Sequence, residues 1–424
     1  MSDSDLMNEW VVVHRERNAP GNQPDSAAAS KTPHKSDLRE TKEFRYACAA
    51  EIQGKIRSYN TKFRLTAINI SAILFIPISC LEHGGLLDHT MKNGYQLKVA
   101  LDNIAILVGH YLRKSHEDLS ESKEEPETAR LCTQQQDETH DAEGRRPLKR
   151  KLSTRETSRK RHSHRKYTDN EEDDDAAGNN DNTNGETHES NQVGRSGTEK
   201  TRCCIRDKFQ CVFTGTSCGG PVHILPFAWN KDEVNKKQTI CSLRGGVAFF
   251  DMSVLSELSR LLGFDLGWSD KFWNMVYVND QLCSKWPLAY FGLKCLSVKP
   301  KQSLDFESSE EPDFEVEIQL NWLHRRREKP TKLMYLEDDD NEMREMAEMQ
   351  IKHEDDAAPP PTDFSTTIIS GHTVALSMPE SDALKCRLML DLHWNLTCIA
   401  AMSGGAEHPD LLPEPVLWAG YSGF

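Results

Sequence analysis

Residues 116–200 contain very few large apolar side chains. A segment of this kind cannot bury enough apolar surface to offset the conformational entropy lost on folding, so we expect a disordered linker there. The gap separates an N-terminal stretch with apolar residues, 43–115, from a C-terminal stretch that begins near residue 201. Only these two stretches can supply a hydrophobic core, and any fold of the chain must be built from them.

The composition supports the same division into ordered and disordered parts. The chain has 424 residues, which is enough for two or three domains. Its apolar fraction is 37%, below the usual ~45–50%, as expected if much of the chain is disordered. Residues 1–42, which are polar and interrupted by prolines, are also predicted to be disordered. The net charge of -14 argues against a protein that binds nucleic acid over its whole surface.

The N-terminus and the cysteines indicate where the protein resides. The first eight residues include Asp3 and Asp5 and no basic segment followed by an apolar core, so we expect no signal peptide. The twelve cysteines form no CxxC pair, and we interpret them as reduced thiols in a nuclear or cytoplasmic protein. The uncharged run 65–81 is shorter than the ~20 residues of a membrane span, so it predicts a buried helix or helix–turn and no membrane.

A basic block lies inside the predicted linker, at residues 145–166, and an acidic run follows it at Glu171–Asp175. Such a block is typical of a nuclear-import signal read by the import machinery, or of a contact with the phosphate backbone of nucleic acid. The alternative is a solvated linker that happens to be basic. The residues that we single out for nucleic-acid contact are Arg145, Arg146, Lys149, Arg150 and Lys151.

The N-terminal apolar stretch predicts helices. Residues 44–52 can form one amphipathic helix, and 95–112 repeats apolar residues at helical spacing. Gly84 and Gly85 mark the turn between them. We expect a small helical module over 43–115, separate from the rest of the chain.

Two further segments follow the central region. Residues 301–365 are predicted to be a charged insertion, in which 314–323 alternates like a strand before its last residues can turn helical. Within that insertion, 337–354 predicts an exposed helix with a narrow apolar stripe made by Met343, Met346 and Met349. The insertion is expected to end before residue 366.

Residues 366–424 are expected to pack on the central domain as a strand and helix segment. Thr366–Leu376 predicts a strand, a turn and a strand, with the turn around Gly371. Asp382–Met402 predicts a helix that Gly404 stops.

The central region, 201–300, carries the residues that can perform chemistry. Alternation of Phe209, Cys211 and Phe213 predicts a strand, and a turn follows it. His223 then lies among aliphatic residues in a second short strand that Pro226 halts. Two strands joined by a loop, with a histidine on the second, form half of a ββα site.

The segment Trp273–Trp286 predicts the other half of such a site. Asn279 or Asp280 can cap a short helix that carries Cys283. The tryptophans at 268, 273 and 286 predict core packing more than base stacking. A further helix is expected over Phe249–Leu262.

The order of these motifs resembles that of a fungal-type HNH nuclease domain, a branch of the ββα-metal nucleases. The shared features are an Arg-Asp pair, CxxTG, HIxPF, Trp-Asn, a cysteine and a tryptophan, and the resemblance covers about half of the chain. It implies that His223 is the general base and that Asn274 holds the imidazole in orientation. It also implies a ligand for a divalent metal ion, Mg or Zn, nine residues after the asparagine.

The ligand position carries Cys283 in place of a histidine, and Val222 before the base offers no side-chain ligand. Thiolate suits zinc better than magnesium, and Cys283 is also readily explained as a packed thiol. Two functions therefore remain open: a metal-dependent endonuclease with a degenerate site, or a catalytically inactive HNH-fold binding or scaffold protein of the nucleus. The predicted fold class is α+β, with a central ββα unit packed by helices.

Overall fold

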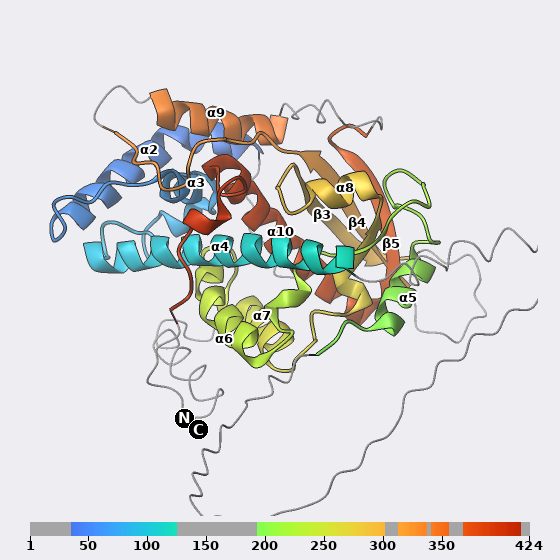
Figure 1. Ribbon diagram of the computed structural model, residues 1–424. Helices are drawn as coiled ribbons and strands as arrows, with labels where there is room; N and C mark the ends of the chain where they lie inside the picture. The colour runs from blue at the N-terminus through green and yellow to red at the C-terminus, as the bar shows by residue number, and fades with distance from the viewer. Residues whose placement is uncertain (1–34, 125–192, 302–312, 337–340, 356–367, 417–424) are drawn as a thin grey trace, which may run out of the picture. The chain divides into compact units, whose positions relative to one another are not determined.

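The computed structural model describes residues 35–124, 193–301, 313–336, 341–355 and 368–416 (Figure 1). All of them belong to one compact unit, whereas Pro126–Glu189 is grouped apart and lies outside the described residues. The described residues combine helices with two small antiparallel sheets, which confirms the α+β class.

The elements follow one another in this order. The helices are α2 (Lys35–Arg57), α3 (Ala67–Phe75), α4 (Gly94–Glu124), α5 (Gly197–Arg206), α6 (Glu233–Ser242), α7 (Met252–Gly263), α8 (Asp280–Lys285), α9 (Asn341–Asp355) and α10 (Glu380–Ser403). The strands are β1 (Gly220–His223), β2 (Met275–Val278), β3 (Phe291–Pro300), β4 (Asp313–Trp322) and β5 (His372–Pro379). Short 3-10 turns include η1 (Ile78–Cys80), η3 (Phe227–Trp229), η4 (Leu243–Ala248), η5 (Phe272–Asn274) and η6 (Pro409–Leu411).

The larger sheet has the order β3-β4-β5, and α10 packs against it (Figure 1). Every second residue of β4 from Val316 to Trp322 is buried, so that one face of the sheet meets the helix. The whole of 313–322 is strand, and the predicted helical end of this segment is wrong. Two strands were predicted around Gly371. The structure describes the second as β5, and residues 356–367, where the first would begin, are outside the described part.

α10 forms the centre of the core, because its side chains from Met389 to Ser403 are buried on all sides. The predicted stop is confirmed: Gly404 has φ 79°, and a β-carbon there would overlap the carbonyl oxygen of Glu328. Only glycine fits this left-handed position against a neighbouring backbone.

The N-terminal helices pack into the same core, so the predicted separate module is wrong. α4 lies between α10 and the α6–α7 pair (Figure 1). Tyr111 of α4 hydrogen-bonds through its hydroxyl to Nδ1 of His393 at 2.8 Å, and His110 bonds Thr239 at 2.8 Å. Since α4 has apolar side chains on more than one face, it requires partners on several sides. It also runs to Glu124, and α2 begins at Lys35, so both extend into segments predicted to be disordered.

The uncharged run folds as the predicted buried helix–turn: α3, Pro77 and η1. Among the described residues, no helix is long and apolar enough to cross a membrane. The last carbonyls of α3 accept hydrogen bonds from Arg45 of α2, at 2.7 Å to Ile73, and from Gln350 of α9. α9 is thus the predicted helix, and Met343 and Met346 of its stripe are buried.

The prediction of a strand at 209–213 is wrong. Lys208 and Phe209 both have φ 56°, which an extended strand cannot accommodate, and the chain turns there. β1 pairs instead with β2, with Gly220 opposite Val278 and His223 opposite Met275. α8 follows β2 directly, and Asn279 caps it as predicted by accepting from the Leu282 N–H at 2.8 Å.

Candidate functional site

His223 is the last residue of β1 and is buried, with 7% of its surface exposed. Its ring stacks on Phe227 of η3, with 5.9 Å between the ring centroids and 25° between the ring planes. The antiparallel pairing with β2 and the turn at Pro226 hold the backbone on both sides of the imidazole. The ring is therefore fixed, and its function depends on what its two nitrogens contact.

Asp270 is the first partner of the imidazole. Its Oδ1 lies 2.9 Å from Nε2 of His223. The other carboxylate oxygen accepts from the backbone N–H of Ser196, the residue that caps α5. Asp270 reaches this position from a turn in which Gly267 has φ 75°. One carboxylate thus joins the strand that carries His223 to the start of α5.

Asp118 of α4 is the second partner. Its Oδ2 lies 3.7 Å from Nδ1 of His223 and accepts from the Phe227 N–H at 2.6 Å. Oδ1 accepts from the Ala228 N–H at 3.1 Å, and the guanidinium of Arg195 lies 3.3 Å away. The imidazole is consequently placed between carboxylates from two different elements.

The pKa values of the two carboxyl groups are shifted in opposite directions. Burial raises the pKa of Asp118, although His223 and Arg195 oppose the shift. Burial alone would also raise the pKa of Asp270, but the hydrogen bond and charge of His223 and the Ser196 N–H together lower it. Asp270 is thus the more firmly ionised member of the pair.

Asn274, the predicted orienting residue, is fully buried and its amide is used by the backbone. Oδ1 accepts from the Leu225 N–H at 3.0 Å, and Nδ2 donates to the carbonyls of Leu225 and Ser269, both at 2.8 Å. It therefore fixes the chain that leaves β1. The carboxylates contact the imidazole, whereas the amide holds the backbone next to it.

Cys283, the predicted ligand position, lies on α8 and is half-buried against the core. The described part of the chain brings together no set of three or more His, Cys, Asp or Glu side chains that could hold a metal ion. A hard divalent cation prefers oxygen ligands, and a thiol at the ligand position does not match it. The thiol of Cys283 therefore does not fit the ligand position for such an ion.

The Arg-Asp pair of the motif has a structural position. Arg206 donates to the carbonyls of Phe272, at 2.9 Å, and Met275, at 2.7 Å. Asp207 accepts from the Tyr277 N–H at 2.9 Å and pairs with Arg206. The two residues tie the end of α5 to β2, and through β2 they support the strand that carries His223.

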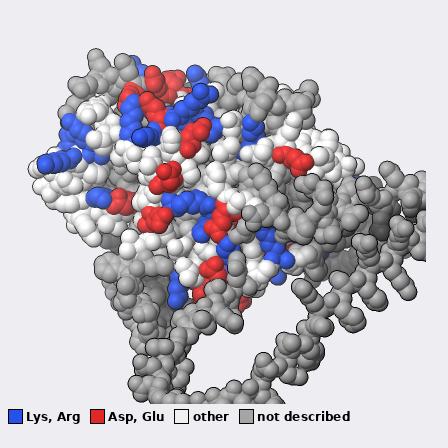
Figure 2. Space-filling model, viewed as in Figure 1, with Lys and Arg blue, Asp and Glu red and all other residues white. Residues whose placement is uncertain are grey.

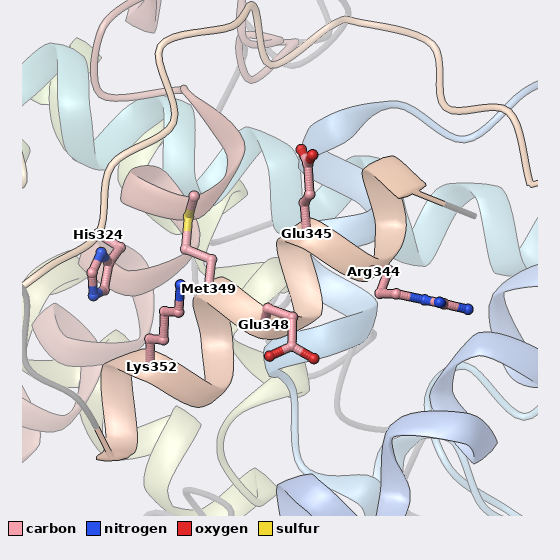
Figure 3. Close-up of a pocket in the computed structure, with 6 residues that line it drawn as sticks. All are labelled: His324, Arg344, Glu345, Glu348, Met349 and Lys352. Carbon is pink, nitrogen blue, oxygen red and sulfur yellow. The ribbon is translucent and has the colours of Figure 1, made fainter. Parts of the chain in front are cut away.

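A separate groove lies on the outer side of α9 (Figure 3). It has a volume of about 570 Å³ and is lined by His324, Arg344, Glu345, Glu348, Met349 and Lys352. Figure 3 shows His324 and Lys352 on one side of it and Arg344 pointing away. The groove shares no residue with the His223 cluster. It is lined by both acidic and basic side chains, and one of the acids, Glu348, also pairs with Lys42.

Sequence reasoning missed both carboxylates. Asp270 lies 47 residues after His223, and Asp118 lies 105 residues before it, beyond the predicted linker boundary. One signal could have indicated Asp118. It follows Tyr111 by seven residues, which places an acid on a buried face of the helix.

Comparison of the chain with protein-family models, with curated proteins and with solved structures finds no match.

Proposed function

We propose that the chain is an HNH-like protein in which the ββα unit serves as a binding or scaffold module in the nucleus and does not cleave nucleic acid. The observation that supports this is the position of the His223 ring between Asp270 and Asp118. A general base needs a ring nitrogen whose lone pair reaches water. Nε2 is hydrogen-bonded to Asp270 at 2.9 Å, Asp118 Oδ2 lies 3.7 Å from Nδ1, and His223 is only 7% exposed, which leaves an attacking water little access to the ring.

The same contacts suit a structural function. His223 connects β1, α4 and the turn before η5, which are far apart in the sequence. Removing one partner from a buried charged network typically destabilises a protein by about 3–5 kcal/mol, because the remaining charge is left unpaired. The imidazole then holds the shape of the unit, and Cys283 acts as a packed thiol.

A cleavage assay tests the proposal. Purified protein is incubated with supercoiled plasmid and with Mg²⁺, Mn²⁺, Ni²⁺ or Zn²⁺, using wild type, His223→Ala and Cys283→His. We expect no nicking that depends on His223 in any metal, and no gain in Cys283→His. Nicking by the wild type that disappears in a folded His223→Ala variant would show that the proposal is wrong.

One observation favours the nuclease as a second candidate. His223, Asn274 and Cys283 occur in the order that the HNH resemblance implies, and α8 follows β2 directly, although His223 lies on the first of the two paired strands and not on the second. The Asp270 carboxylate at 2.9 Å is also the kind of group that orients a catalytic imidazole. This candidate expects nicking by the wild type, and a loss of nicking in both His223→Ala and Asp270→Asn.

We also propose that residues 145–166, which lie outside the described residues, direct the protein to the nucleus. Replacing Arg145, Arg146, Lys149, Arg150 and Lys151 with glutamine in a fluorescent fusion is expected to shift the signal to the cytoplasm. An unchanged nuclear signal would remove support for the import function.

A further inference from the structure

α2 ends near the start of α4 (Figure 1). Gly94, the first residue of α4, lies against the backbone of Lys55 and Ile56. The segment 329–335 joins them, because the Met334 N–H bonds the Leu65 carbonyl at 2.8 Å. Residues 91–99 and 329–336 are therefore both neighbours of the chain at 51–65, and we call the exposed side chains of 51–64, 91–99 and 329–336 the basic–aromatic surface.

The charge of this surface is opposite to that of the chain. The three segments contain eight Lys and Arg residues and one acid, Glu51, although acids outnumber bases by 66 to 52 in the whole sequence. Lys98 pairs with Asp102, and Lys332 pairs with Glu328 and Glu342. Basic side chains are visible at this end of the molecule in Figure 2. A local excess of positive charge remains on an acidic protein.

Large side chains that could have been buried are exposed between these charges. Tyr95 and Met91 are each 66% exposed, Tyr335 is 50% exposed and Tyr59 is 49% exposed. The guanidinium of Arg64 lies 4.4 Å above the ring of Tyr335. Tyr59 and Tyr95 each lie within four residues of the contact between Gly94 and the end of α2.

We infer that the basic–aromatic surface binds single-stranded nucleic acid. Cations track the phosphates, and exposed tyrosine rings offer faces on which unpaired bases stack. A duplex offers the phosphates but not the unpaired bases, so the exposed rings favour a single strand. This inference uses none of the residues of the His223 site and goes beyond the proposed function.

The test measures fluorescence anisotropy with labelled oligo-dT of about twenty nucleotides, oligo-U of equal length and a matching DNA duplex. The protein is the full chain with Arg145, Arg146, Lys149, Arg150 and Lys151 replaced by glutamine, so that the basic block does not contribute. If the basic–aromatic surface binds as inferred, the single-stranded probes bind more tightly than the duplex. A comparison of oligo-dT with oligo-U then distinguishes DNA from RNA.

In this background, Tyr59→Ala, Tyr95→Ala and Tyr335→Ala together are expected to weaken single-strand binding at least about tenfold. The same variant is expected to change duplex binding less than about twofold, because a duplex exposes no base faces. Lys55→Gln with Lys62→Gln is expected to reduce the slope of log K against log salt by about 1.4.

Two exposed residues elsewhere supply matched controls: Phe264→Ala for the tyrosines and Lys237→Gln for the lysines. Both are expected to leave affinity and salt slope unchanged, and thermal unfolding checks that every variant is folded. Three results would each overturn the inference: no single-strand binding at low salt, equal binding by the tyrosine variant, or equal losses for duplex and single strand.

Discussion

Burial determines what the His223 imidazole can do. The ring occupies the position of a general base in the order of motifs, but Asp270 is hydrogen-bonded to Nε2 and the Asp118 carboxylate lies 3.7 Å from Nδ1. A histidine in such a network contributes by pairing with its neighbours, since the cost of an unpaired buried charge exceeds that of a lost surface contact. The same residue type in the same motif can therefore have either function, depending on the acids around it.

Asp118→Asn is expected to lower the free energy of unfolding by about 1.5–3 kcal/mol. The amide can keep one backbone N–H acceptor contact, but it loses the charge that faces His223 and Arg195. Urea denaturation measures the change. Asp102→Asn on the same helix is the control: its side chain and that of its partner Lys98 are 44% and 35% exposed, and a surface pair of this kind contributes only about 0–1 kcal/mol. Equal effects of the two substitutions would contradict a special function of Asp118.

Asp391 predicts a dependence of stability on pH. Burial raises its pKa to about 7, although Arg387 and Lys294 oppose the shift. A carboxyl whose folded pKa is raised contributes stability that is present below its unfolded pKa, near 4, and is lost as the pH rises toward 7. The wild type should therefore lose stability relative to Asp391→Asn between pH 5 and pH 7, by up to about 1.4 kcal/mol per pH unit.

Urea denaturation at pH 5 and pH 8 measures this difference between Asp391→Asn and the wild type. Asp313→Asn, at an exposed position of β4, serves as the control and should follow the wild type. A constant difference between Asp391→Asn and the wild type at both pH values would show that Asp391 does not titrate in this range.

Sequence reasoning named His223 but missed the two carboxylates beside it, for a physical reason. His223, Asn274 and Cys283 belong to short local motifs, so they could be named from the residues around them. The two carboxylates belong to no motif, and only the packing of α4 against η3 brings Asp118 to the imidazole. Contacts of this kind are not encoded in the periodicity of either segment.

At the scale of elements, helices were easier to predict than strands. α4, α7, α9 and α10 follow from apolar spacing, and α8 from its cap. The small sheet was predicted with the wrong partner, because 209–213 alternates like a strand, whereas β2 is four buried residues with no alternation. The left-handed backbone at Lys208 and Phe209 excludes the nearer segment, and no glycine marks it.

Gly404→Ala is expected to destabilise the protein by more than Gly371→Ala, although both glycines have similar positive φ, 79° and 87°. At Gly371 an added β-carbon meets nothing within 4 Å, so the cost is the backbone strain alone, about 1–2 kcal/mol. At Gly404 the same strain is joined by overlap with the Glu328 carbonyl. Denaturant midpoints compare the two, and equal losses would show that the chain relaxes around the α10 end without cost.

At the scale of the whole molecule, the core is shared between stretches that the sequence separates. α10 packs against α3, α4 and β3, which places elements from both sides of the 125–192 segment around one helix. The described residues on either side of the 125–192 segment lie near each other. Arg195 contacts Asp118, and six residues of helix beyond Asp118 extend α4 by only about 9 Å.

This arrangement predicts opposite results for two deletions. Replacing 126–189 with a Gly/Ser linker of ten residues, which reaches about 33 Å, is expected to leave the melting temperature within about 2 °C of the wild type. A chain that begins at residue 190 lacks α2, α3 and α4 and exposes the apolar surface of α10 that they cover. It is expected to lose cooperative unfolding, since its core is then incomplete. Calorimetry measures both, and a sharp transition in the shorter chain would show that the C-terminal stretch folds alone.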